Sequence, residues 1–310
     1  MATPSIQPFD CHTHTVFSDG SSTFEENVRA AAAVGCRVLV STDHLTEPAS
    51  MDPTSSWTLA ECDLPAHRRA FEEARELARE IAPTMEFIYG FECDWYEGCE
   101  PLIERWSTGA VVRLGSVHWL GAPGDILAGA ARRSPDGLSW EEVAAPAGGP
   151  GTDAGNIDDS DEMHLWHELG ADEIWRRYVH TWCRACESPL AFDVMAHPDL
   201  PMRFANEGFA PTIDVAPLWD EMAACARDTG RRVELSTAGL RKGVGDFYPA
   251  FGLLERFARA GVPLTLSTDA HRACDICWGF DKAVARAYET GYRAVDMPHE
   301  DGSWERIELA

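Results

Sequence analysis

The sequence has little positive charge, no long apolar run and no leader-like start, and each absence excludes a class of protein. Lysine and arginine total 26 against 51 aspartates and glutamates, which leaves a net charge of −25. Such a surface repels phosphate backbones, so we expect no nucleic-acid partner. No stretch of 18 apolar residues occurs, so we expect no membrane-spanning helix. Residues Met1 to Phe9 lack a basic stretch followed by an apolar core, so we expect no secretory signal.

The cysteines indicate a reducing compartment. Ten cysteines without a secretory signal favour free thiols in the cytoplasm over a disulfide framework. Two pairs, Cys183-x-x-Cys186 and Cys274-x-x-Cys277, have the spacing of zinc-ribbon ligands. The first pair lies in a predicted helix over 172–187 and neither pair has knuckle glycines, so buried free thiols are the favoured interpretation.

The order of apolar segments predicts an α/β protein. The hydrophobic fraction of 45% and charged fraction of 25% are typical of globular proteins, and the length alone allows one large barrel or two ordinary domains. Strands that alternate with helices indicate a parallel sheet. The seven predicted strands are 6–11, 37–41, 85–91, 110–117, 190–196, 231–235 and 262–267. Helices are predicted from a capping box at Thr23–Glu26 to Gly35, and over 65–81, 172–187, 212–229, 247–260 and 279–290.

Two segments depart from the strand–helix alternation. Residues 121–162 are rich in Gly, Pro, Ala and Asp and have little periodicity, which predicts either a partly ordered lid over the site or a disordered insertion. The tail, 294–310, is predicted to be a hairpin that turns at Asp301-Gly302.

Most residues that could carry chemistry lie where a predicted strand ends. In a barrel, the carboxyl ends of the strands face one mouth, where catalytic residues gather. Imidazole and carboxylate are ligands for zinc, manganese and iron, so the pattern predicts a polynuclear metal site and favours a hydrolase. The residues concerned are His12, His14, Asp19, His44, Glu92, His118, His197, Asp269 and His271.

Some of these positions carry further indications. His12 and His14 are two residues apart on a strand, so both side chains point to one face. Glu92 at a strand end would be costly to bury unless it binds a metal or a cation. Asp10 and Asp43 are suited to hold a ligand histidine in one tautomer.

These residues, in this order, resemble the PHP (polymerase and histidinol phosphatase) superfamily along essentially the whole chain. The similarity is closer to the histidinol-phosphatase branch. It is carried by segments 115–118 (GSVH), 197–200 (HPDL), 234–243 (ELSTAGLRKG), 248–249 (YP) and 267–271 (STDAH). The resemblance implies one domain over 1–310, a distorted (β/α)7 barrel with three divalent metal ions (Zn, Mn or Fe) at the C-terminal mouth of its strands.

The resemblance also implies a ligand set for each ion. The first ion would take His12, His14, Glu92 and Asp269. The second would share Glu92 and add His118 and His197. The third would take Asp19, His44 and His271, although many members of the family have histidine at the position of Asp19.

The implied activity is the hydrolysis of L-histidinol phosphate to L-histidinol and phosphate by a metal-bridging hydroxide. Arg203, Arg241 and Lys242 are candidates to bind phosphate, with Arg241 also a candidate catalytic residue. Asp199 is the candidate to protonate the leaving oxygen or orient water. Weaker candidates for contact with the leaving group are Asp94, Trp95, Tyr96 and Glu97. His164 and His167 are interpreted as loop residues.

Three other functions are considered. One is a PHP phosphoesterase acting on a nucleotide or another small phosphate ester. The second is a non-catalytic metal-binding regulatory module, which would have lost ligands, whereas every expected ligand position here is filled. The third, an amidohydrolase-type barrel, shares His-x-His but fits the Thr-Asp-Ala-His ending poorly. A small phosphorylated substrate is expected for either phosphatase, and the sequence leaves the oligomeric state open.

Overall fold

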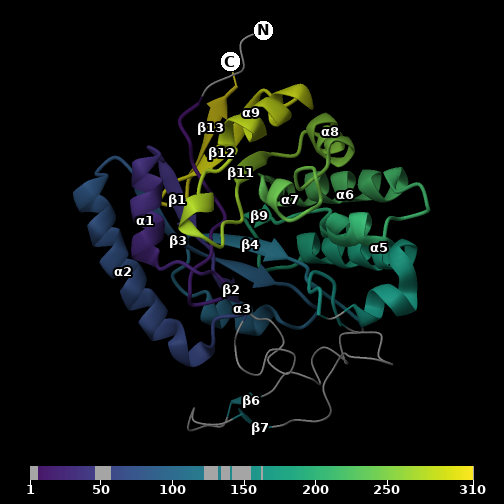
Figure 1. Cartoon of the computed structure of the whole chain (residues 1–310), viewed down its shortest axis with the longest axis horizontal. Coiled ribbons are helices and arrows are strands. Elements are labelled where there is room, and N and C mark those ends of the chain that lie inside the picture. Colours follow the sequence, from purple (N-terminus) through teal and green to yellow (C-terminus); the bar gives the residue numbers. More distant parts are fainter. Residues whose placement is uncertain are drawn as a thin grey trace.

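The computed structural model describes residues 6–45, 57–121, 132–133, 140–141, 155–161 and 163–309. Parallel strands form a curled sheet in the order β1-β3-β4-β9-β10-β11, with the short β2 paired to β3 (Figure 1). The bounds are β1 Val38–Ser41, β2 His44–Leu45, β3 Glu86–Asp94, β4 Val112–Ser116, β9 Val194–Met195, β10 Arg232–Ser236 and β11 Leu264–Ser267. The expectation of an α/β barrel-type sheet is confirmed.

The N-terminal segment closes the gap between the first and last strands of this order. Asp10 bridges Leu39 of β1, and Thr13 bridges Ala270 just past β11, both in parallel. The strand predicted over 6–11 is therefore present only as the bridge at Asp10 and not as a continuous ladder. At Thr13, the backbone N–H donates to Thr42 Oγ1 (3.0 Å) in place of a backbone carbonyl.

Helices surround the sheet (Figure 1). They are α1 Phe24–Ala33, α2 Leu64–Ile81, α3 Glu100–Trp106, α5 His164–Glu187, α6 Ala216–Thr229, α7 Ala238–Arg241, α8 Phe251–Ala260 and α9 Phe280–Glu289, with 3-10 turns at Glu61–Asp63, Leu200–Glu207 and Ala273–Asp275. The capping box predicted at Thr23 and Glu26 is confirmed, with each side chain bonded to the other's backbone N–H at 2.8 and 3.2 Å. Large apolar side chains such as Trp175, Trp182 and Phe257 are fully buried between the helices and the sheet.

Helix α5 begins earlier than its sequence predicts. His164 and His167 lie in its first turns, so the interpretation of both as loop residues is wrong. Gly170, with a φ of 73° and a ψ of 160°, is not helical and separates this short first segment from the longer one, which begins about where the sequence predicts. Cys183 and Cys186 in this helix are buried and form no disulfide, which agrees with the predicted buried thiols, whereas Cys274 of the second pair is exposed.

The end of the chain forms an antiparallel hairpin of β12 (Ala294–Pro298) and β13 (Trp304–Glu308). Gly302 in its turn has a φ of 82°, a conformation that glycine adopts without strain. Among the described residues, no helix combines the length and apolar character needed to cross a bilayer.

Most of the predicted lid, 122–131, 134–139, 142–154 and 162, lies outside the described residues. Two short strands of this segment, β6 (Arg132–Arg133) and β7 (Trp140–Glu141), pair antiparallel with each other. Residues 155–161 are described, and β8 (Gly155–Asn156) pairs antiparallel with β5 (Trp119–Leu120), directly after His118. The end of the insertion is thereby placed beside a predicted metal ligand.

Candidate metal centre

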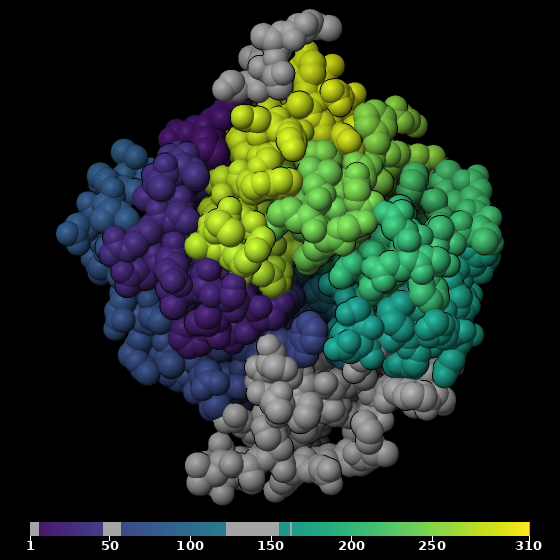
Figure 2. Space-filling model, viewed as in Figure 1, coloured from purple at the N-terminus to yellow at the C-terminus, as the bar shows by residue number. Residues whose placement is uncertain are grey.

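The predicted ligands meet in one pocket at the carboxyl ends of the strands. Seven of the nine line it, and the other two, His12 and His14, lie fully buried behind them. In the space-filling view the surface is hollowed where purple N-terminal, yellow C-terminal and teal-to-green middle segments meet (Figure 2), and the lining residues come from these same parts of the sequence. Parallel strands thus bring together residues that are up to 259 positions apart, from His12 to His271.

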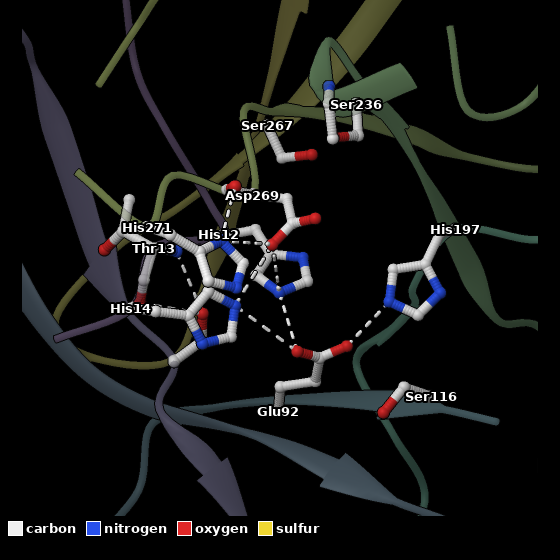
Figure 3. Close-up of polar contacts among 12 residues, drawn as sticks. His12, Thr13, His14, Glu92, Ser116, His197, Ser236, Ser267, Asp269 and His271 are labelled. Carbon is white, nitrogen blue, oxygen red and sulfur yellow. Dashed lines mark hydrogen bonds and ion pairs between the residues drawn. The ribbon is translucent and has the colours of Figure 1, made fainter. Parts of the chain in front are cut away.

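Glu92, near the end of β3, is the centre of the cluster. Its Oε2 lies 2.9 Å from His12 Nε2 and 3.4 Å from His14 Nε2. Its Oε1 lies 2.8 Å from His197 Nε2, on the opposite side of the carboxylate (Figure 3). His44 Nδ1 is 3.2 Å from Oε2. A buried carboxylate surrounded by imidazoles on both oxygens is suited to bridge two ions.

Two further carboxylates complete the donor set. Asp269 Oδ1 lies 3.2 Å from His14 Nε2 and 3.8 Å from His12 Nε2. Asp19 Oδ2 lies 2.8 Å from His271 Nε2, and its Oδ1 lies 3.6 Å from a ring nitrogen of His14. Both carboxylates therefore have at least one oxygen that faces imidazole nitrogens of the cluster.

Four sets of these side chains have ligand atoms within 4.8 Å of one another, so each could hold an ion. They are His14, Asp19, His44 and His271; His12, His14 and Glu92; His44, Asp94 and His118; and Glu92, His118 and His197. The last set has the same members as the predicted second ion site. The first contains the predicted third site and adds His14.

Several buried ring nitrogens make no hydrogen bond and are suited to bind a metal ion. Within the described residues, both ring nitrogens of His14 are buried without a hydrogen bond, as are His44 Nδ1 and His197 Nδ1. A buried polar atom without a partner costs free energy, and coordination to an ion would remove that cost. Burial and the nearby His271 and His44 also lower the pKa of His14 to about 4, which keeps it in the neutral form that metals bind.

The carboxylates are held in their charged form. Burial opposes ionisation of Glu92, but the charges of His12 and His44 together with its hydrogen bonds lower its pKa well below its ordinary value. Burial likewise opposes ionisation of Asp269, and Lys242 and the adjacent histidines reverse that effect and lower its pKa. Both side chains therefore offer anionic oxygens for an ion.

The comparisons with known proteins agree with this geometry. No family model matches the chain. A Deinococcus radiodurans protein named "Probable histidinol-phosphatase" is 27% identical over 297 residues, which are 94% of this chain and 96% of that protein. The Lactococcus lactis histidinol phosphate phosphatase, solved with zinc, L-histidinol and phosphate, superposes with a TM-score of 0.69 at 17% identity over 97% of this chain and 100% of that chain.

The chain resembles the histidinol phosphatases in sequence and fold. This confirms the predicted resemblance to the histidinol-phosphatase branch of the PHP superfamily. The likeness to the solved structure establishes the fold, since its sequence identity is low.

Two carboxylates orient histidines of this site: Glu234, which the sequence did not single out, and Asp94, which the sequence named only as a candidate for contact with the leaving group and which does not line the pocket. Glu234 Oε2 lies 3.0 Å from His12 Nδ1, and its Oε1 accepts the backbone N–H of His197 (2.7 Å). Asp94 contacts Nδ1 of His118 in the same way. Both leave Nε2 free for a metal, the usual arrangement of a carboxylate behind a ligating histidine.

The predicted role of Asp10 and Asp43 is wrong. Asp10 accepts from Thr268 and from the backbone N–H of Cys277, and it bonds no ring nitrogen. Asp43 bonds the ring of His67 (2.9 Å), which is not one of the predicted ligands. Asp10 instead fixes the loop after β11, and Asp43 accepts from Thr15 N and Oγ1 in the loop that carries Asp19.

Among the three predicted phosphate-binding cations, only Lys242 lines the pocket, with Nζ 2.8 Å from Asp269 Oδ2. Arg241 lies behind it, paired with Asp275 at 2.9 Å and bonded to the carbonyl of Thr268. Arg203 also lies outside the lining, with Nη1 donating to the carbonyl of Lys242 (3.1 Å). In this arrangement both arginines support the loops that carry Lys242 and Asp269.

Asp199, the candidate proton donor, is fully buried and lies outside the lining of the pocket. Its Oδ2 accepts the backbone N–H of Ala250 at 2.7 Å. Burial raises its pKa to about 7, so it can carry a proton near neutral pH. Its predicted catalytic role stays a prediction.

The candidates for contact with the leaving group lie elsewhere. Trp95 donates its indole N–H to Glu100 (3.1 Å). Tyr96 is buried and Glu97 is exposed. None of these three residues lines the pocket. Instead the pocket is lined on this side by Trp57, Asn156, Asp158 and Asp159. The sequence offered a lid over 121–162 as one alternative, but nothing in it indicates which residues of that insertion line the pocket.

Proposed function

We propose that this chain is a metal-dependent phosphomonoesterase that hydrolyses L-histidinol phosphate to L-histidinol and phosphate. The observation that carries the proposal is the cluster of six histidines around Glu92, with buried ring nitrogens that lack hydrogen bonds. The relative from Deinococcus radiodurans, which matches nearly the full length of both chains, supports the choice of substrate.

We propose three divalent ions in the pocket, of zinc, manganese or iron. The ligand sets are those implied by the resemblance, with Glu92 shared between the first two ions. The zinc in the Lactococcus lactis structure supports this class of metal. Ions bound there would supply a hydroxide nucleophile near pH 7 and offset charge on the phosphate oxygens.

The chain's own side chains would bind and orient the substrate. Lys242 is the cation at the pocket and would pair with a phosphate oxygen, as a point charge on a flexible stem. Glu234 and Asp94 would keep His12 and His118 in the tautomer that presents Nε2. We further propose a cytoplasmic location, because ten free thiols suit a reducing compartment.

The test is phosphate release from L-histidinol phosphate by manganese- or zinc-loaded protein, beside a panel of nucleotide and sugar phosphates. The proposal predicts a kcat/KM for histidinol phosphate at least about a hundredfold above any other ester, a difference of about 3 kcal/mol. Broad activity, or activity directed at nucleotides, would contradict the proposed substrate but would agree with metal-dependent hydrolysis. No release from any ester, with ions bound, would indicate a binding module.

A further inference from the structure

One wall of the pocket is built by the returning end of the insertion, residues 155–161, and it is fixed against the predicted ligands. Asn156 pairs with Trp119 across β5 and β8. The backbone N–H of Ile157 donates to the carbonyl of His118 (2.9 Å), and Trp166 Nε1 donates to the carbonyl of Ile157 (3.2 Å). The side chains of this wall therefore hold a set position relative to His118.

This wall is negatively charged where it faces the pocket. Asp158 and Asp159 line it beside the amide of Asn156. Asp158 is paired with Arg203 Nε at 3.3 Å. Asp159 has no cation within 4.0 Å among the described residues. Its Oδ1 accepts the backbone N–H of Asp161 (2.8 Å), which holds the carboxylate in one orientation.

The pocket therefore presents charges of both signs. Lys242 and the predicted ion sites would take the phosphate. The partly buried carboxylate of Asp159 and the indole of Trp57 also line the pocket, and neither residue is a predicted ligand. A phosphate ester whose alcohol carries an amine complements this lining, since the amine pairs with a carboxylate and a cation also favours an aromatic face. A nucleoside monophosphate, whose alcohol is neutral, would leave Asp159 without a cation, and a sugar acid phosphate would place negative charge against it.

We propose that Asp159 is a specificity-determining residue that binds the positively charged amine of the leaving alcohol. This inference rests on the proposed function and deepens it, because it names the group that distinguishes an amino-alcohol phosphate from a neutral ester. Asp159 selects the substrate, and the phosphate end of the pocket carries out the hydrolysis.

The experiment compares Asp159→Asn with the unaltered protein, both metal-loaded, on L-histidinol phosphate and on p-nitrophenyl phosphate, an ester without an amine. Asparagine keeps the oxygen that accepts from Asp161 and removes only the charge. A charge-assisted hydrogen bond contributes about 1.5–3 kcal/mol, so the ratio of the two kcat/KM values is expected to fall by about ten- to hundredfold. Calorimetry should show L-histidinol binding weakened by a similar factor, with inorganic phosphate binding retained.

Asp161→Asn is the matched control, because Asp161 is an exposed carboxylate of the same turn and does not line the pocket. It is expected to keep the ratio of the unaltered protein. An Asp159→Asn protein that keeps this ratio, or that loses both activities equally, would overturn the inference. An unaltered protein with no preference for histidinol phosphate would instead overturn the proposed function, so the two failures are distinguishable.

Discussion

Strand β3 carries a cluster of histidine and carboxylate side chains at each end, and the two clusters differ in burial and hydrogen bonding. At its first residue, Glu86 Oε1 lies 2.7 Å from His299 Nδ1, and His299 Nε2 lies 3.2 Å from Glu305 Oε2. Both ring nitrogens of His299 are thus satisfied, and 24% of its side chain is exposed. Near the other end, Glu92 and His14 are buried, and both nitrogens of His14 lack a hydrogen bond among the described residues.

The comparison shows that residue type alone does not identify a metal site. Both clusters contain the ligand types that zinc accepts. At Glu86 the histidine bonds carboxylates directly, at the surface, which is an ordinary ion-pair arrangement. At Glu92 the rings converge on shared oxygens, and although His12 and His197 bond Glu92, both nitrogens of His14 lack a hydrogen bond among the described residues, a cost that a bound cation would remove.

The largest expected effect comes from exchanging the two glutamates in turn for glutamine. Glu92→Gln removes the shared charged oxygen and should lower kcat/KM by about a thousandfold, since metal ions supply several kcal/mol of transition-state stabilisation. Bound metal, counted by inductively coupled plasma mass spectrometry, should fall with it. Glu86→Gln is the matched control and should keep both metal and activity.

A Glu86→Gln protein that loses metal would contradict the claim that only the cluster at Glu92 binds ions. A Glu92→Gln protein with full metal content and normal turnover would contradict the same claim.

The second expected effect tests the carboxylates that lie behind the histidines. Glu234 contacts His12 in the buried cluster, and Glu305 contacts His299 in the exposed one. Glu234→Gln should cost about 10–100-fold in metal affinity or activity, because it loosens the orientation of a ligand. Metal titration monitored by activity measures the change, with Glu305→Gln as its counterpart. Equal affinities in the two variants would contradict the role given to Glu234.

The positions of the ligands were predictable because parallel strands share one mouth. His44, Glu92 and His118 each follow an apolar run, so their meeting required only the order of strands and helices. The roles of Glu234 and Asp94 were not predictable in this way, because each depends on which ring nitrogen a side chain reaches.

The place of Asp159 in the pocket and the partners of Asp10 and Asp43 could not be predicted from the sequence either. Asp159 reaches the pocket only because Ile157 bonds the carbonyl of His118 across a long insertion, and insertion length does not determine where a chain returns. The predicted pairing of Asp10 and Asp43 with ligand histidines failed because backbone N–H and hydroxyl groups bond Asp10, and because Asp43 bonds His67.

A smaller effect is expected at the cation of the pocket. The chain has two lysines, of which Lys242 lines the pocket and Lys282 is exposed on α9. Lys242→Gln should raise KM for a phosphate ester by about tenfold, since a hydrogen bond to a charged group contributes about 1.5–3 kcal/mol. Inhibition by inorganic phosphate should weaken by a similar factor. Lys282→Gln should leave both values unchanged, and a matching loss there would contradict a specific role for Lys242.

The smallest expected effect concerns pH and the exposed cluster. Hydrogen bonds with Glu86, and then its charge, raise the pKa of His299 above 6.5. A raised histidine pKa gives stability that is complete below 6.5 and is lost as the pH rises through the raised value. The free energy of unfolding should therefore exceed that of His299→Gln by less than about 1 kcal/mol at pH 6, and the difference should vanish at high pH. Urea unfolding across this range measures it, and a difference that grows with pH would contradict the assignment.

The central claim, that the buried cluster at the end of β3 binds the ions that make this chain a phosphatase, is tested most directly by removing and restoring metal. Chelator-treated protein would be titrated with manganese or zinc while bound ions and phosphate release from L-histidinol phosphate are measured together. We predict no turnover without metal, and activity that returns as the bound ions approach three per chain. Full activity in metal-free protein, or three bound ions without any turnover, would contradict the claim.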